Sequence, residues 1–308
     1  MKDQASSLRQ MVKKEQDLKG RKKMSPKNSL RVIAVSSGKG GVGKTNVVAG
    51  LALSLSRTGK KVLIIDADLG LANIDIIFNV RPKLNISDVM NGEASIKEIL
   101  VELQENISLI PAGSGISDLT RLSDAQKLAL LNEFDEIDGD FDYVLVDTGA
   151  GISDNVLYFN LAADDCIVVT TTEPTAITDA YALMKVMSIE HGYKYFKLIV
   201  NMVKSEKDAK RVYFSLSQAA SKFLGSAVIE YIGYLPVEPK ISESVIKRMP
   251  YINSNPNSEF TKAMTKIAGV LSRSVSKNTD SGNLKLFMNR FAVKKSSKSV
   301  KKSEKQGH

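Results

Sequence analysis

The chain has 308 residues and carries 43 Lys and Arg against 34 Asp and Glu, a formal net charge of +9, with 43% hydrophobic residues. These figures describe a globular protein with a sizeable core and exclude a wholly disordered chain. The chain has one cysteine and two histidines, which argues against disulfide-rich, zinc and iron–sulfur proteins. It has no run of eighteen apolar residues and a polar N-terminus, which argues against membrane-spanning and secreted proteins. We therefore expect a soluble protein of a reducing compartment.

The excess positive charge lies at the two ends of the chain. Residues 1–31 hold ten Lys or Arg and three acids, and residues 285–308 hold eight and one. Residues 32–284 hold 25 bases and 30 acids, so the body is mildly acidic. A basic chain suggests a polyanionic partner, either nucleic acid or an acidic membrane face. That expectation applies here to the tails, because a nucleic-acid-binding fold more often carries a basic stripe on its folded face.

From Leu30 onward, short apolar segments rich in β-branched residues alternate with helical segments. The apolar runs are continuous, which is typical of strands buried on both faces. The predicted strands are 31–35, 62–65, 107–110, 143–146, 166–169 and 196–200. The predicted helices are 44–57, 124–134, 155–163, 176–191, 206–223 and one after Pro256 to about residue 275, because proline suits a first helical turn. The pattern predicts an α/β fold, a mostly parallel, doubly wound sheet with helices on both faces.

The composition divides the chain into five parts. Residues 1–29 form an N-terminal extension, and residues 30–275 form the α/β domain. Residues 276–283 (SKNTDSGN) have the composition of a flexible linker. Residues 284–293 are predicted as an amphipathic helix, and residues 294–308 as a basic disordered tail.

A glycine-rich segment follows the first predicted strand and opens the first helix. Gly38–Thr45 satisfies the pattern G-x-x-x-x-G-K-[ST] in the strand, loop and helix context that this pattern requires. Glycines let backbone N–H groups surround an anion, and the helix N-terminus adds partial positive charge. Lys44 reaches the β- and γ-phosphates, and Thr45 binds Mg²⁺. The segment predicts a nucleotide site made of Gly38, Lys39, Gly40, Gly41, Val42, Gly43, Lys44, Thr45 and Asn46.

Lys39 adds a second lysine inside the same loop. The pattern K-G-G-x-G-K-[ST] is a deviant Walker A motif, and in it the chain resembles the MinD/ParA family of P-loop ATPases. The resemblance implies an ATP-sandwiched homodimer in which Lys39 crosses to the partner's phosphates. Lys39 and Lys44 would then both neutralise charge in the transition state of ATP hydrolysis.

Three carboxylates follow predicted strands, at Asp66, Asp68 and Asp147. Side chains at the carboxyl ends of parallel strands face the crevice where open α/β sheets bind ligands. The family resemblance implies that Asp68 orients the attacking water, that Asp66 supports the metal and its loop, and that Asp147 holds Mg²⁺ through water. Asp75, in the same run as Asp68, is interpreted as structural.

The adenine end of the predicted site carries weaker signals. Asn201 ends the strand 196–200, and similar proteins read the adenine edge with an asparagine there, aided by Pro236, Val237 and Glu238. An asparagine at a strand end is also a common turn residue. The segment 173–180 resembles the family as well, although Pro174 at its start is also ordinary helix-entry chemistry.

The predicted C-terminal helix has one apolar stripe, formed by Leu284, Phe287, Met288 and Phe291 at positions i, i+3, i+4 and i+7. A basic amphipathic helix beyond a linker indicates an interfacial anchor at an anionic membrane, although a helix packed on the body has the same pattern. A single such helix binds marginally, whereas a dimer presenting two binds far better. We therefore expect a cytoplasmic protein that associates reversibly with the cytoplasmic face of the inner membrane when ATP makes the dimer.

The N-terminus opens with a short amphipathic pattern suited to a groove in a partner. Asp3, Gln4, Ala5, Leu8 and Arg9 match a D-Q-A-x-x-L-R motif, and here the chain resembles the FlhG family, also called FleN or YlxH, of MinD-like regulators of flagellar number and placement. The resemblance spans about residues 1–293 and implies activation of the FlhF GTPase and binding of flagellar basal-body or regulatory proteins. Nucleic acid is not an expected partner.

Two other functions remain open from the sequence. A ParA-type partition ATPase would bind DNA nonspecifically through basic residues, which the tails could supply, but it does not need the apolar stripe around Phe287. An adaptor in which ATP only sets the conformation would not need Lys39, Lys44, Asp68 and Asp147 together.

Overall fold

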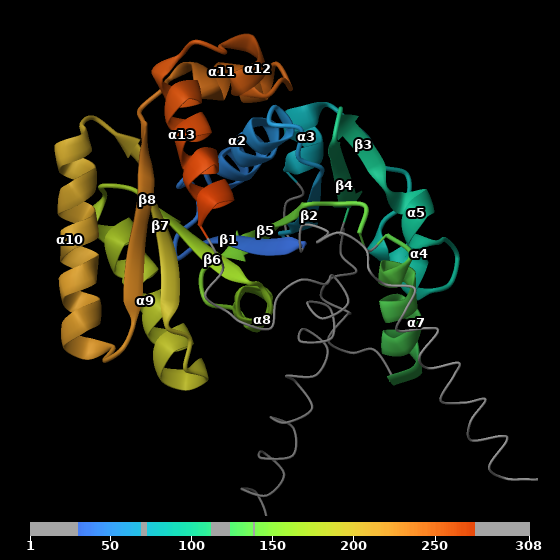
Figure 1. Cartoon of the computed structure of the whole chain (residues 1–308), viewed down its shortest axis with the longest axis horizontal. Coiled ribbons are helices and arrows are strands. Elements are labelled where there is room, and N and C mark those ends of the chain that lie inside the picture. Colours follow the sequence, from blue (N-terminus) through green and yellow to red (C-terminus); the bar gives the residue numbers. More distant parts are fainter. Residues whose placement is uncertain (1–29, 69–72, 112–123, 138, 275–308) are drawn as a thin grey trace, which may run out of the picture.

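A computed structural model of the chain describes residues 30–68, 73–111, 124–137 and 139–274 (Figure 1). The predictions for the N-terminal motif, the linker, the amphipathic helix and the basic tail lie outside the described residues.

Within the described residues, eight strands form one sheet with the order β3-β4-β2-β5-β1-β6-β7-β8. Neighbouring strands pair in parallel except β3 with β4. This architecture confirms the predicted fold class. The strands are β1 (Arg31–Ser37), β2 (Val62–Ala67), β3 (Val101–Gln104), β4 (Ile107–Pro111), β5 (Tyr143–Ala150), β6 (Asp165–Thr170), β7 (Tyr195–Val203) and β8 (Val228–Pro236).

The two edge strands, β3 and β8, were not predicted. Strand β3 is four residues long, none of them buried. Strand β8 carries Glu230 and the conformationally permissive Gly233, at φ +150°, inside its apolar run. Only part of the surface of an edge strand is buried. Edge strands therefore lack the continuous apolar runs by which the six central strands were predicted.

Helices cover both faces of the sheet (Figure 1). Successive strand residues alternate between the faces, so Ile33 and Val35 join one core while Val32 and Ala34 join the other. One face holds α2 (Lys44–Ser56), α3 (Ile74–Phe78), α11 (Lys240–Ile246), α12 (Tyr251–Ser254) and α13 (Glu259–Arg273). The other holds α4 (Ile86–Met90), α5 (Ile96–Ile99), α7 (Asp124–Asp135), α8 (Asp154–Ala162), α9 (Pro174–His191) and α10 (Glu206–Phe223). No helix among the described residues is long and apolar enough to cross a membrane.

The last helix begins after Pro256 as predicted, but the reason given for its start was wrong. Helix α13 begins at Glu259, and Pro256 lies in the turn before it. Ser258 provides the N-cap, since its side chain accepts a hydrogen bond from the backbone N–H of Thr261 at 3.1 Å. A serine cap therefore starts this helix, and the proline does not enter its first turn.

Arg31 joins the start of β1 to the end of α13. Its guanidinium donates to Asp165 Oδ2 at 2.6 Å, to the carbonyl of Leu271 at 2.5 Å and to the carbonyl of Ser274 at 2.7 Å. A cation at the end of a helix satisfies carbonyls that lack partners within the helix. Arg31 and Ser274 therefore meet at the amino edge of the sheet. The P-loop lies roughly 20 Å away, at the other end of β1.

Candidate active site

The P-loop connects β1 to α2 at the carboxyl edge of the sheet. Gly43, at φ +83°, has the left-handed backbone that glycine accepts without strain. Gly38 packs against α9, and a Cβ there would meet the Asp179 backbone at 2.1 Å. Lys44 is then the first residue of α2. The loop thus has the strand, loop and helix arrangement that the motif predicted.

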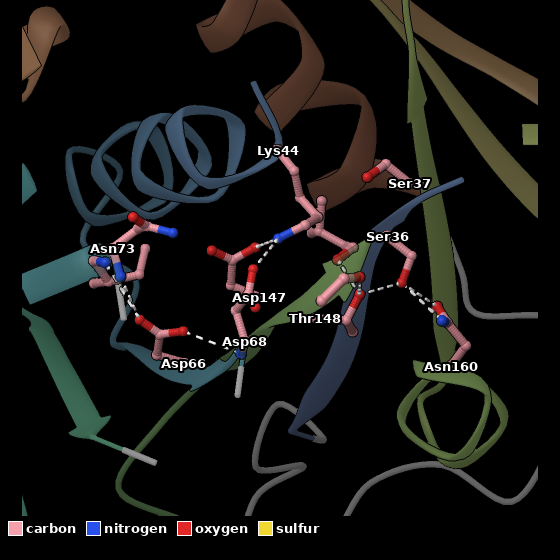
Figure 2. Close-up of polar contacts among 12 residues, drawn as sticks. Ser36, Ser37, Lys44, Asp66, Asp68, Asn73, Asp147, Thr148 and Asn160 are labelled. Carbon is pink, nitrogen blue, oxygen red and sulfur yellow. Dashed lines mark hydrogen bonds and ion pairs between the residues drawn. The ribbon is translucent and has the colours of Figure 1, made fainter. Parts of the chain in front are cut away.

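Lys44 points from this helix start toward two carboxylates (Figure 2). Its Nζ lies 2.5 Å from Asp147 Oδ1 and 4.0 Å from Asp68 Oδ2. Asp147 lies within β5 and is fully buried, whereas Asp68 lies just after β2 and its side chain is 28% exposed. Three of the predicted site residues, separated by as many as 103 positions in the chain, therefore meet at one point.

Asp147 is the deepest carboxylate of the site. Burial raises its pKa, and the charge of Lys44 opposes this effect. Its second oxygen, Oδ2, is buried and has no hydrogen-bond partner among the described residues. A buried anionic oxygen without a partner is a fitting ligand for a hard cation or its bound water.

The donor set around Asp147 fits Mg²⁺. The described residues contain no cluster of three or more His, Cys, Asp or Glu side chains that could hold a metal alone. Mg²⁺ commonly takes one or two carboxylates together with phosphate oxygens and water. Asp147 and the Thr45 hydroxyl would hold it, and the bound ion would neutralise charge on the phosphates.

Asp66 organises the loop that follows β2. Its carboxylate accepts hydrogen bonds from the backbone N–H groups of Asp68 at 3.2 Å, Asn73 at 3.1 Å and Ile74 at 3.3 Å (Figure 2). Asp66 thereby fixes the backbone of Asp68 and the start of α3. Burial, and then the charge of Asp147, raise the pKa of Asp66 from 3.8 to about 7. Its predicted contribution to the metal site stays a prediction.

Replacing Asp66 with asparagine should change how stability depends on pH. In the unfolded chain Asp66 ionises near its ordinary pKa of 3.8, whereas the folded protein keeps the proton up to about pH 7. The wild-type free energy of unfolding should therefore decrease as pH rises from about 4 to 7, and Asp66→Asn should remove about 2–4 kcal/mol of this decrease. Urea unfolding without Mg²⁺ at pH 5 and 8 measures the difference. Equal pH dependence in the two proteins would contradict the raised pKa.

Lys39 lies at the rim of the site and points away from Lys44's partners. Its Nζ contacts Glu173 Oε2 at 2.8 Å and the Thr175 hydroxyl at 2.9 Å. Glu173 is the N-cap position of α9, but its side chain does not cap the helix. The sequence singled out this segment only through its resemblance, and helix-entry chemistry offered an equally good reason for it. The contact with Lys39 gives Glu173 and Thr175 a second role.

Asn201 contacts the back of the P-loop. Its Nδ2 donates to the carbonyl of Val42 at 2.8 Å, and its Oδ1 accepts from the N–H of Met202 at 2.9 Å. Among the other residues predicted for the adenine end, Val237 is half exposed just beyond β8. The contact supports the shape of the P-loop, and adenine recognition by Asn201, Pro236, Val237 and Glu238 stays a prediction.

A P-loop at a sheet's carboxyl edge, with one lysine between two carboxylates and a second at the rim, defines a P-loop nucleoside triphosphatase. The ParA family model, described as NUBPL iron-transfer P-loop NTPase, matches residues 28–272. Antiactivator FleN of Pseudomonas aeruginosa is 35% identical over 270 residues, covering 88% of this chain and 96% of FleN. Flagellum site-determining protein YlxH of Helicobacter pylori is 38% identical over 245 residues, covering 80% of this chain and 83% of YlxH. The chain belongs to the MinD/ParA family of P-loop ATPases, in the FlhG group with FleN and YlxH.

Solved structures agree with this assignment. A chain of the MinC:MinD cell division protein complex of Aquifex aeolicus matches with a TM-score of 0.65 and 28% identity, covering 80% of this chain and 97% of that chain. MinD of Pyrococcus horikoshii complexed with Mg-ADP matches with a TM-score of 0.63 and 25% identity, covering 79% and 96%. The family implies nucleotide and Mg²⁺ binding and ATP hydrolysis. The iron transfer in the family description does not suit this chain, because its one cysteine, Cys166, is buried.

Proposed function

We propose that this protein is an ATP-dependent dimerising switch, a slow ATPase that regulates the number or placement of flagella from the membrane surface. The observation that carries the proposal is the position of the two P-loop lysines. Lys44 is buried between Asp147 and Asp68, whereas the Lys39 side chain is 39% exposed at the rim. The names of the relatives, antiactivator FleN and flagellum site-determining protein YlxH, supply the biological process.

The contacts of Lys39 support a role across a dimer interface. Its ion pair with Glu173 is largely exposed, and such pairs contribute only about 0–1 kcal/mol. Lys39 can therefore leave Glu173 at little cost and bind phosphates of a nucleotide held by a second copy. Hydrolysis then depends on the dimer, because each site is completed by the partner's lysine.

The position of Ser274 supports a membrane-binding segment that is separate from the nucleotide site. Ser274 is held by Arg31 at the amino edge, opposite the P-loop. An amphipathic helix that begins beyond this point needs no contact with the ATP site. ATP instead controls membrane binding through dimerisation, because two linked helices bind with the effective concentration of a bivalent ligand. The affinity for the membrane comes from partial burial of large apolar side chains. Each Lys or Arg near an anionic surface adds about 1 kcal/mol.

Liposome sedimentation tests this function. Full-length protein should sediment with anionic vesicles in ATP but not in ADP, and Phe287→Glu should abolish the ATP-dependent fraction because a charge enters the apolar stripe. Asn289→Glu, which adds the same charge beside the stripe, is the matched control and should retain most binding at moderate salt. The proposal is wrong if the wild type sediments with vesicles equally in ATP and in ADP. The partition ATPase would be favoured instead if Phe287→Glu leaves binding unchanged, and if binding decreases steeply with salt and is competed by DNA.

We also propose an FlhF-like GTPase as the partner of the N-terminal motif, together with flagellar basal-body or regulatory proteins. Deleting residues 1–11 should abolish stimulation of the partner's GTP hydrolysis and leave ATP hydrolysis within about twofold of wild type. The expectation rests on the location of those residues, which precede the domain and its P-loop. Parallel GTPase and ATPase assays measure both activities. Undiminished GTPase stimulation by the shortened chain would refute the assignment.

A further inference from the structure

A series of buried hydrogen bonds lies beside the Lys44–Asp147 pair (Figure 2). It joins Asn160 of α8, Ser36 of β1 and Thr148 of β5, all of which are 0% exposed. Asn160 Nδ2 lies 2.7 Å from Ser36 Oγ, and Ser36 Oγ lies 2.6 Å from Thr148 Oγ1. The series therefore connects a helix to the two strands that carry the P-loop and Asp147.

The hydrogen bonds of Asn160 determine which atom donates and which accepts in each bond of this series. Its two amide hydrogens point to the carbonyl of Val156 at 2.7 Å and to Ser36 Oγ. Its oxygen accepts from the thiol of Cys166 at 3.0 Å. Ser36 Oγ also lies 2.9 Å from that oxygen, but its one hydrogen is then needed for Thr148. With the amide in this orientation every polar atom of Asn160 has a partner.

The hydrogen bonds end at Thr148, whose hydroxyl can donate to the carbonyl of Val35 at 3.1 Å or to that of Gly149 at 3.0 Å. The pairing of β1 and β5 changes at this point: Val35 is opposite Asp147, and Ser37 is opposite Ala150. Strand β5 thus has one extra residue between Asp147 and Ala150, an irregularity of the β-bulge type. Bulges next to active sites set the direction of the side chains beside them.

The residues on either side of the bulge belong to the two loops of the active site. Ser37 follows Ser36, its hydroxyl donates to the carbonyl of Lys39 at 2.9 Å, and its own carbonyl accepts from the N–H of Gly151 at 2.8 Å. Gly151 leads into α8, which carries Asn160. The two loops are thus tied to the residues next to Ser36 and Thr148, whose buried hydrogen bonds have no water to replace them if these residues move.

We propose that Asn160, Ser36 and Thr148 form a positioning relay that sets the bulge after Asp147 and so holds the Asp147 carboxylate against Lys44 for ATP hydrolysis. The inference rests on the proposed ATPase function. None of the three is a catalytic residue, because each acts through Asp147 or the P-loop.

The test compares Thr148→Val with Thr148→Ser. Valine keeps the shape of threonine and removes the hydroxyl, whereas serine keeps the hydroxyl and loses a methyl group. We expect Thr148→Val to lower kcat for Mg-ATP by about tenfold or more with KM for ATP within about twofold, because small misplacements of reacting groups lower rates steeply. Thr148→Ser should retain kcat within about threefold of wild type. Thermal unfolding of both variants shows whether each is folded at the assay temperature.

Each outcome decides the proposal. A kcat for Thr148→Val equal to wild type, or Thr148→Ser impaired as strongly as Thr148→Val, would overturn the relay. If Thr148→Val does not fold, Ser36→Ala breaks the same series one bond earlier and should give the same loss of kcat at unchanged KM. Comparing ATP hydrolysis by the wild type with that by Lys44→Met tests the ATPase function separately from the relay. If the wild type fails that comparison, the ATPase function is wrong; if it passes, the variants judge the relay alone.

Discussion

Replacing Lys44 with methionine should lower kcat/KM for ATP hydrolysis by at least about 10²-fold, the usual effect of removing one preorganised cationic or hydrogen-bonding group from a transition state. Lys44 Nζ lies 2.5 Å from Asp147 and 4.0 Å from Asp68, and the side chain is 7% exposed. Methionine preserves much of the length and packing, so the lost charge causes the effect. Single-turnover hydrolysis with anionic vesicles present measures the rate, and nucleotide titration measures binding.

The same substitution should destabilise the protein, because it leaves the buried Asp147 carboxylate without its cation. Breaking a buried ion pair by removing one partner costs roughly 3–5 kcal/mol. The double variant with Lys44→Met and Asp147→Asn should recover most of this stability and still fail to hydrolyse ATP. Urea unfolding compares the three proteins. A Lys44→Met variant that hydrolyses ATP at the wild-type rate would contradict the proposed site.

Replacing Asp68 with alanine should stop turnover while ATP-dependent dimerisation persists. Removing a group that orients or deprotonates the attacking water lowers rates by about 10²–10⁴-fold. Asp68 is partly exposed and lies 4.0 Å from Lys44, so its loss disturbs the fold far less than the loss of Lys44. The variant should accumulate as an ATP-bound dimer on liposomes, because it enters that state and leaves it slowly.

Asp75→Ala is the matched control for Asp68. Among the described residues, the Asp75 carboxylate accepts a hydrogen bond only from the backbone of its own helix, the N–H of Ile76 at 2.7 Å. Its removal should leave hydrolysis within about twofold of wild type, as for surface substitutions generally. Size-exclusion chromatography with ATP, together with single-turnover rates, distinguishes the two variants. If Asp68→Ala does not dimerise in ATP, the role given to Asp68 is wrong.

The sequence predicted the central strands and the long helices well, because their signals are local. The predicted bounds of α10, residues 206–223, agree with the structure, and Ser205 caps that helix by accepting from the N–H of Asp208. The edge strand β8 was missed because its apolar run is interrupted, and the start of α13 was attributed to the wrong residue, because a proline was preferred to the serine that caps it. Both errors arise where two local signals compete and tertiary contacts decide between them.

The chemistry of the site was predictable for a similar reason. The P-loop is contiguous, its glycines and helix start act through the backbone, and the carboxylates follow strands whose ends must share one edge of a parallel sheet. The partners of these residues were not predictable. Lys39 meets Glu173, Asn201 supports Val42, and Asn160 reaches Ser36, across 134, 159 and 124 positions of the chain.

The sequence alone therefore determined the class of fold, the nucleotide chemistry and a charge pattern in which a mildly acidic body carries two basic ends. Only the tertiary structure decided that Lys44 pairs with Asp147, that Lys39 pairs with Glu173, and that Arg31 joins β1 to the end of α13 at the edge opposite the P-loop. The reason is physical. Local patterns fix backbone conformation and burial, whereas contacts between distant side chains depend on strand order and register, which arise when the whole core packs.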